Sequence, residues 1–168
     1  MSAVAAGELP RDSFLIGYRE RGAFADCYST VVPGAVTLER YVLAFYTSPL
    51  FKIERFILRW AVRKPSTDED ATRLALGAAS TFAAWTTEQR SADQLLMCDY
   101  VGRTRSWFMV APDAGGTRLY FGSAVVPGRD GRMGSSFSAL LWFHRLYSVA
   151  LLRAARGRAA ISATSGTR

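Results

Sequence analysis

The chain has 168 residues, of which 49% are hydrophobic and 12% aromatic, and this is enough to build the core of one domain. Its formal net charge of +7 comes from arginines dispersed from Arg11 to Arg168, and a dispersed charge argues against a nucleic-acid-binding protein. The N-terminus lacks the basic start and apolar run of a signal peptide, and the longest apolar segment, residues 138–155, is interrupted by charged side chains. We therefore expect a cytoplasmic protein with no transmembrane segment.

The first part of the chain is predicted to be a loose segment, because residues 1–20 mix glycine, proline and charged side chains. The first strand is predicted at residues 24–32, which are rich in β-branched and aromatic residues and end at Pro33-Gly34. We place a single domain at residues 21–157.

A group of helices is predicted to follow this strand. Thr37 is expected to cap the first helix, whose apolar residues recur at the i, i+3, i+4, i+7 spacing of one buried face. Ser48 and Pro49 indicate a second helix, because a capping hydroxyl precedes a proline at the first helical position. Residues 66–69 have the pattern of a capping box for a third, short helix, which Gly77 is expected to end.

After Gly77 the pattern changes to further strands separated by turns, which predicts an antiparallel sheet of about five strands in all. These further strands are predicted at residues 82–88, 94–100, 104–110 and 117–125. In a hairpin that turns at Val101-Gly102, both faces carry apolar residues, whereas a sheet with one wet face alternates apolar and charged residues. We therefore expect both faces of the sheet to be covered, by helices of this chain or by a second subunit.

The end of the chain is predicted to contain a loop, a long helix and a tail. Residues 127–134 are rich in glycine and charge and are predicted to form the loop. A helix with a broad apolar face is predicted from residue 135 to 156, and the small, polar and basic residues 158–168 are expected to be a disordered tail. The predicted fold class is therefore α+β, with the antiparallel sheet packed on a long C-terminal helix and paired helices inserted after the first strand.

This order of elements, over residues 24–156, resembles the helix-grip superfamily (SRPBCC), which includes the START and Bet v 1-like domains. Residues 102–107, 119–125 and 143–148 are similar to bacterial families of that superfamily to which no function is assigned. The resemblance implies a space between the sheet and the C-terminal helix, which in the superfamily commonly holds a hydrophobic small molecule. Some members use the same space for cyclase or dehydratase chemistry, so the fold alone does not fix the function.

Three residues are candidates for acid–base catalysis. His144 is the only histidine, so any imidazole mechanism must use it. Asp99 and Tyr120 are its candidate partners, because a carboxylate on an apolar face can be desolvated enough to exchange protons near neutral pH. Each candidate also has a structural interpretation, such as an aspartate that bonds the backbone of a turn. The sequence leaves open whether the chain is an enzyme.

The residues predicted to bind a ligand combine apolar walls with a few polar anchors, as small-molecule sites commonly do. They are Arg105, Trp107, Tyr120, His144 and Tyr147. Arg105 has forked donors that suit a carboxylate or phosphate, and its pairing with Glu88 or Asp99 across the sheet is an equal alternative.

Several kinds of chemistry lack a motif in this sequence. No nucleophile elbow, phosphate-binding glycine loop or metal-ligand spacing occurs, so no metal or cofactor is predicted. Cys27 and Cys98 lie in apolar runs and are expected to be buried free thiols. The leading hypothesis is a module that binds a hydrophobic or amphipathic small molecule. The alternatives are a cyclase- or dehydratase-type enzyme using His144, and a homodimeric interaction protein without a ligand.

Overall fold

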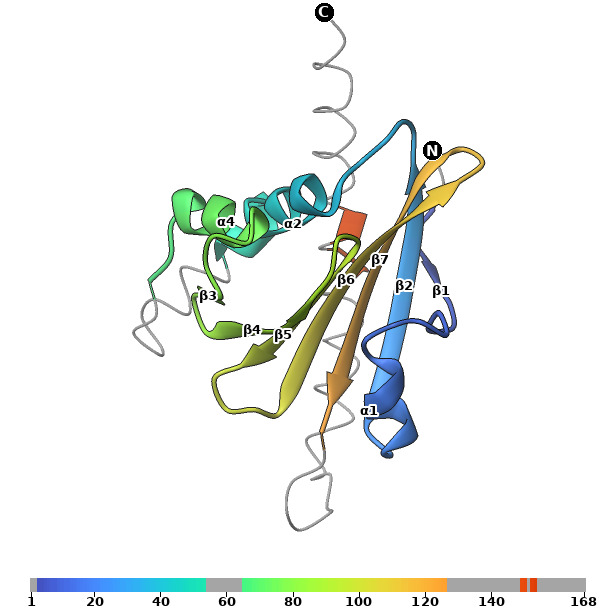
Figure 1. The fold of residues 1–168 in the computed structure, drawn as a ribbon. Coiled ribbons are helices and arrows are strands. Elements are labelled where there is room, and N and C mark those ends of the chain that lie inside the picture. The colour runs from blue at the N-terminus through green and yellow to red at the C-terminus, as the bar shows by residue number, and fades with distance from the viewer. Residues whose placement is uncertain (1–2, 54–64, 127–148, 151, 154–168) are drawn as a thin grey trace, which may run out of the picture.

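The computed structural model describes residues 3–53, 65–126, 149–150 and 152–153, which form a sheet with helices on both faces (Figure 1). The strands are β1 (Ala5–Ala6), β2 (Phe24–Val32), β3 (Thr81–Phe82), β4 (Trp85–Arg90), β5 (Gln94–Asp99), β6 (Thr104–Asp113) and β7 (Gly116–Val125). The helices are α1 (Ile16–Glu20), α2 (Leu38–Tyr46) and α4 (Asp68–Ala75), and residues 49–53, 149–150 and 152–153 are also helical. The fold is α+β, as predicted.

Within the described residues, the sheet has seven antiparallel strands in the order β1-β2-β7-β6-β5-β4-β3. The prediction of about five strands was wrong, because it missed β1 and β3, each of which has 2 residues. Two residues are too few to produce an alternating pattern. Residues 82–88, predicted as one strand, contain a turn at Ala83, whose φ of 50° reverses the chain so that β3 pairs with β4.

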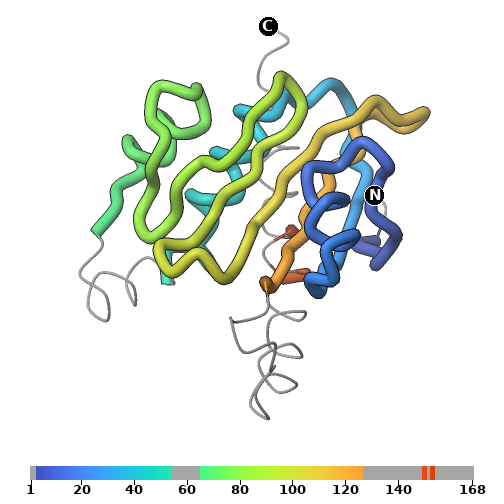
Figure 2. Tube along the Cα trace, turned by 60° about the horizontal axis from the view of Figure 1, so that its bottom comes forward, coloured from blue at the N-terminus to red at the C-terminus, as the bar shows by residue number. Residues whose placement is uncertain are grey.

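The β5-β6 hairpin has the predicted register, with Leu95 opposite Phe108 and Leu96 opposite Trp107. Alternate residues therefore point to opposite faces of the sheet. One face carries Phe108 and packs against α2 and α4, and we call it the helix-covered face. The other face carries Trp107 and packs against α1, and we call it the α1 face. Figure 2 shows the N-terminal segment, in dark blue, and α2, in light blue to cyan, on opposite sides of the sheet.

The N-terminal segment differs from the prediction of a loose segment through residue 20. Leu9 and Leu15 are 7% and 0% exposed, and both pack with Trp107 in the core of the α1 face. Two apolar residues separated by Pro10 and charged side chains are too few to establish a period, so this packing could not be predicted. The prediction that both faces are covered is confirmed, and this chain supplies both covers.

The helix ends show where local sequence patterns were reliable. Thr37 caps α2 by accepting a hydrogen bond from the Arg40 backbone N–H. The capping box of α4 is one residue later than predicted, with Thr67 and Asp70 bonding each other's backbone N–H groups. Both registers fit the motif, and Thr67 is the residue with the extended backbone that an N-cap requires. Gly77, with a φ of 73°, follows the end of α4 as predicted.

The predicted C-terminal helix lies mostly outside the described residues, as do the loop at 127–134 and the tail at 158–168. Of the helix, residues 149–150 and 152–153 are described and are helical. Leu152 is 0% exposed and Val149 packs beside it, both in the core of the helix-covered face. No helix in the described part of the chain is long and apolar enough to cross a membrane.

Candidate functional site

A partly buried polar contact joins β2 and β7 on the helix-covered face. Asp26 and Ser123 are direct cross-strand partners, and their side chains lie on the same face as those of Tyr28 and Phe121. Asp26 Oδ1 accepts a hydrogen bond of 3.0 Å from the Ser123 backbone N–H and one of 2.7 Å from Ser123 Oγ. One oxygen of the carboxylate is thus fully engaged by the neighbouring strand.

The other carboxylate oxygen, Asp26 Oδ2, is buried and accepts no hydrogen bond from the described residues. Burying a charged acceptor without a donor costs several kcal/mol in principle, and almost all such atoms in folded proteins are paired. Asp26 Oδ2 is therefore an acceptor that a hydrogen-bond donor of a bound molecule would satisfy.

Ser106 extends this contact into a short strip across three strands. Ser106 of β6 is the cross-strand partner of Ser123 on the side away from Asp26. We call Asp26, Ser123 and Ser106 the polar row. Phe108 lies two residues after Ser106, and Phe121 lies two residues before Ser123. Their ring centroids are 5.3 Å apart in the aromatic cluster under α2. The polar row therefore borders an apolar region, the combination that amphipathic ligands require.

Gly122 allows the backbones to come close at the polar row. A Cβ at this position would lie 2.7 Å from the carbonyl oxygen of Asp26 and 2.9 Å from both Leu15 Cδ1 and Trp107 Cε3. Any side chain here would have to displace backbone or core atoms. A glycine within a strand indicates either a bulge or a close backbone approach, and at Gly122 the structure shows the close approach.

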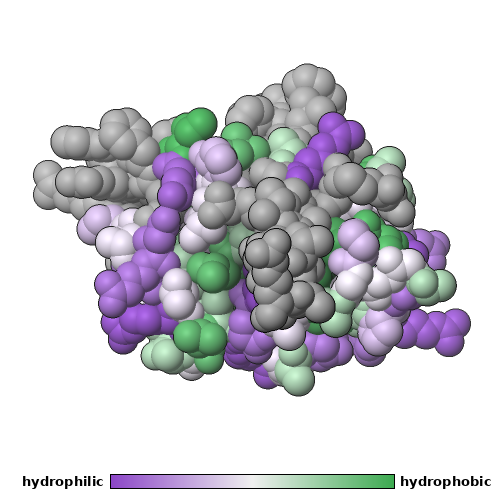
Figure 3. All heavy atoms as spheres, turned by 90° about the horizontal axis from the view of Figure 1, so that it is seen from above, coloured by the Kyte–Doolittle hydropathy of each residue, from purple (hydrophilic) through white to green (hydrophobic). Residues whose placement is uncertain are grey.

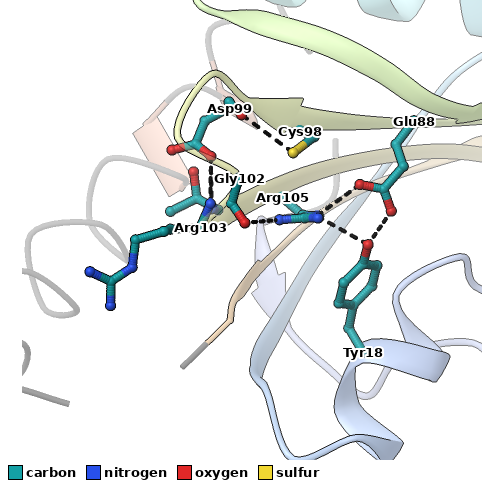
Figure 4. Close-up of polar contacts among 8 residues, drawn as sticks. Tyr18, Glu88, Cys98, Asp99, Gly102, Arg103 and Arg105 are labelled. Carbon is teal, nitrogen blue, oxygen red and sulfur yellow. Dashed lines mark hydrogen bonds and ion pairs between the residues drawn. The ribbon is translucent and has the colours of Figure 1, made fainter. Parts of the chain in front are cut away.

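A second polar group lies on the α1 face and consists of Tyr18, Glu88 and Arg105, which we call the α1 latch (Figure 4). Arg105 Nε donates to Glu88 Oε2 at 2.9 Å and to Tyr18 Oη at 3.1 Å. Arg105 Nη1 donates to the Gly102 carbonyl oxygen at 2.6 Å, and Tyr18 Oη donates to Glu88. The guanidinium also lies 4.9 Å from the centroid of the Tyr18 ring. Its charge is thus balanced by Glu88, the alternative that the sequence had left open.

The α1 latch attaches a helix to the sheet. Tyr18 belongs to α1, Glu88 to β4 and Arg105 to β6, so the group joins three elements that are distant in sequence. Burial raises the pKa of Tyr18 and its hydrogen bond to Glu88 raises it further, while Arg105 opposes the rise. The phenol therefore remains a donor at neutral pH, which suits a structural contact.

Asp99 closes the turn between β5 and β6. Its Oδ1 accepts hydrogen bonds from the backbone N–H groups of Arg103 at 2.8 Å and Thr104 at 3.1 Å (Figure 4). This is the turn-forming role that the sequence offered as the structural interpretation. Asp99 follows Met97 on the helix-covered face, whereas Tyr120 packs on the α1 face. The two candidate partners for acid–base chemistry therefore lie on opposite sides of the sheet.

The predicted ligand-binding residues that the structure describes all lie on one face of the sheet. Arg105, Trp107 and Tyr120 all project to the α1 face, whereas Val149 and Leu152 pack on the helix-covered face. Trp107 is fully buried, and its Nε1 donates to Gln94 Oε1 at 2.8 Å. These three residues therefore do not lie between the sheet and the helical residues 149–150 and 152–153. His144 and Tyr147 lie outside the described residues.

Both cysteines are free thiols, as predicted, but only Cys27 is buried; the prediction that Cys98 is buried was wrong, since it is partly exposed. Burial, with the charge of Asp26 adding to it, raises the pKa of Cys27 to about 12. Burial also raises the pKa of Cys98. Both thiols are therefore protonated near neutral pH and are poor nucleophiles. Among the described residues, no group of three or more His, Cys, Asp or Glu side chains is placed to hold a metal ion.

Neither a protein-family model nor a curated protein matches this chain. The functional argument therefore rests on the polar row. Sequence reasoning missed Asp26 and Ser123, although one signal was present: Asp26 is the only charged residue in the predicted strand 24–32. A lone carboxylate within a strand that is buried on both faces must find partners, and that requirement identifies it.

Proposed function

We propose that this chain binds a hydrophobic or amphipathic small molecule on the helix-covered face of its sheet, at the polar row. The observation that carries the proposal is the buried Asp26 Oδ2, which no described residue supplies with a donor. The apolar part of the ligand would lie at the border of the neighbouring aromatic cluster, whose own side chains are packed in the core. Affinity would come from burial of that apolar part, and orientation from the polar row.

A helix-grip-like arrangement is part of the same proposal. Its support is the order of elements, in which β2 is followed by helices and then by the antiparallel strands β3 to β7. The pairing of β2 with β7 and the packing of Val149 and Leu152 on the helix-covered face agree with it. In that arrangement the ligand lies between the sheet and the C-terminal helix, and the polar row belongs to the sheet face on which Val149 and Leu152 pack.

No described contact favours the alternatives to the same degree. The enzyme hypothesis pairs His144 with Asp99 or Tyr120, and Asp99 is committed to two backbone N–H groups. The homodimer hypothesis relied on an uncovered sheet face, and this chain covers both faces. In the view from above, hydrophobic residues on the described surface are interspersed with hydrophilic ones (Figure 3).

Thermal unfolding in the presence of a library of lipids and aromatic compounds tests the proposal. A ligand at about one hundred times its Kd stabilises a protein by about 2.7 kcal/mol, which is a rise in Tm of about 5–10 °C for a chain of this size. No rise with any compound would contradict ligand binding.

Two variants locate the site. Ser106→Leu adds apolar bulk to the polar row and should reduce the ligand-induced rise in Tm. Tyr120→Phe, on the α1 face, should leave it unchanged. The reverse pattern would place the ligand on the α1 face and overturn the assignment to the polar row.

A further inference from the structure

We infer that the polar end of the ligand is a hydrogen-bond donor, preferably an ammonium group, and that Asp26 Oδ2 accepts from it. This inference rests on the proposed function and specifies the class of molecule bound. It differs from the expectation based on Arg105, whose forked donors suit a carboxylate or phosphate.

The hydrogen bonds of the polar row determine which kind of ligand group can bind Asp26 Oδ2. Asp26 Oδ1 already accepts from the backbone N–H and the hydroxyl of Ser123. A carboxylate has no proton to donate when ionised, so Asp26 Oδ2 can only be satisfied by a donor. A ligand group with N–H or O–H fits this requirement, and an ionised carboxylate or phosphate does not.

Asp26 takes no part in the ion pairs of the described residues, and this favours a ligand cation further. Among the described residues, the ion pairs join Lys52 to Asp68, Arg90 to Glu39, Arg105 to Glu88 and Arg118 to Asp113. None of them includes Asp26. A partly buried carboxylate that has no basic partner among the described residues attracts a ligand cation and repels a ligand anion, and both effects are stronger away from water.

Arg105 cannot reverse this preference. It projects to the α1 face, where Glu88 balances its charge and its side chain is only 13% exposed. An anionic headgroup on the helix-covered face would therefore meet Asp26 and not Arg105. We expect affinity to fall in the order amine, alcohol, carboxylate for ligands with the same apolar chain.

Calorimetric titration with decylammonium, decanol and decanoate, each below its micelle-forming concentration and at neutral pH, tests this order. Decylammonium should bind at least tenfold more tightly than decanoate. The chain carries a net charge of +7, so non-specific attraction would favour decanoate and the expected order reports the site itself. This comparison uses the unmodified chain, so it does not depend on whether a variant folds.

Asp26→Asn then tests the assigned residue, because asparagine keeps the shape of the side chain and loses its charge. The variant should bind decylammonium at least tenfold more weakly than the unmodified chain does, while its affinity for decanol should change less than threefold. Glu20→Gln, an equal loss of charge at an exposed position of α1, should leave both unchanged. Circular dichroism confirms that each variant is folded.

The outcomes separate the two proposals. If none of the three probes binds, the proposed function fails. If decanoate binds as tightly as decylammonium, or if Asp26→Asn binds decylammonium like the unmodified chain, the inference about the headgroup fails while ligand binding stands.

Discussion

Gly122 is a position where one methyl group should have a measurable cost. In Gly122→Ala the new Cβ would meet the Asp26 carbonyl oxygen, Leu15 and Trp107, and two of these three neighbours are side chains packed in the core. We expect a loss of about 1–3 kcal/mol in the free energy of unfolding, measured by urea denaturation.

Gly7→Ala is the matched control for this change. A Cβ on Gly7 has no neighbour within 4 Å, so the substitution should alter stability by less than about 0.5 kcal/mol. Equal stabilities of the two variants would mean that β2 and β7 are not in close contact at Gly122.

Cys27 should make stability depend on pH in the alkaline range. Its pKa rises from 9.0 to about 12 on folding, so the folded chain keeps a proton that the unfolded chain loses. The stabilising contribution of Cys27 to the free energy of unfolding is therefore fully present below pH 9. It is lost as the pH rises toward 12, by at most about 1.4 kcal/mol per pH unit. Urea denaturation at about pH 8 and pH 10 should show a larger loss for the unmodified chain than for Cys27→Ala. Parallel losses in the two proteins would show that Cys27 does not titrate this way.

At single positions the sequence predicted what local chemistry determines. Thr37 and Gly77 were identified correctly because a cap and a helix end each restrict the residue types allowed. Asp26 could not be identified in the same way, because its importance depends on Ser123, which is distant in sequence and adjacent only through the pairing of β2 with β7.

At the scale of elements, the α1 latch should decide how firmly α1 holds to the sheet. Tyr18→Phe keeps the ring under the guanidinium of Arg105 and removes the hydrogen bonds to Glu88 and Arg105. We expect a loss of about 0.5–1.5 kcal/mol and faster amide hydrogen exchange in residues 16–20.

Tyr100→Phe provides the comparison, since Tyr100 is 61% exposed at the tip of the β5-β6 hairpin. It should change neither stability nor exchange in α1. If Tyr18→Phe behaves like Tyr100→Phe, the hydrogen bonds of the α1 latch do not attach α1.

The helices and long strands were predicted because each has a periodic apolar pattern and defined ends. The strand predicted at 24–32 coincides with β2, and the apolar stripe of the helix after Thr37 is buried in α2. The short elements α1, β1 and β3 were missed because they have 5, 2 and 2 residues, too few for any period to be visible. Their positions are fixed by contacts with distant parts of the chain.

At the scale of the whole molecule, the two-sided apolar pattern of the β5-β6 hairpin predicted that both faces of the sheet are covered. It did not predict which segments cover them. Residues 3–20 supply one cover. Their sequence resembles a linker, because Leu9 and Leu15 are the hydrophobic residues of this segment that are buried in the core of the α1 face. For the same reason the sequence could not show that Arg105, Trp107 and Tyr120 lie on the α1 face, opposite to the face on which Val149 and Leu152 pack.

Native mass spectrometry of the gently purified chain, followed by denaturation and analysis of any released molecule, is the measurement to make first. We predict a mass increase equal to one small molecule per chain, and a released compound that combines an apolar body with an amine or hydroxyl group. A bare chain mass, under conditions in which a known lipid-binding protein keeps its ligand, would contradict binding at the polar row.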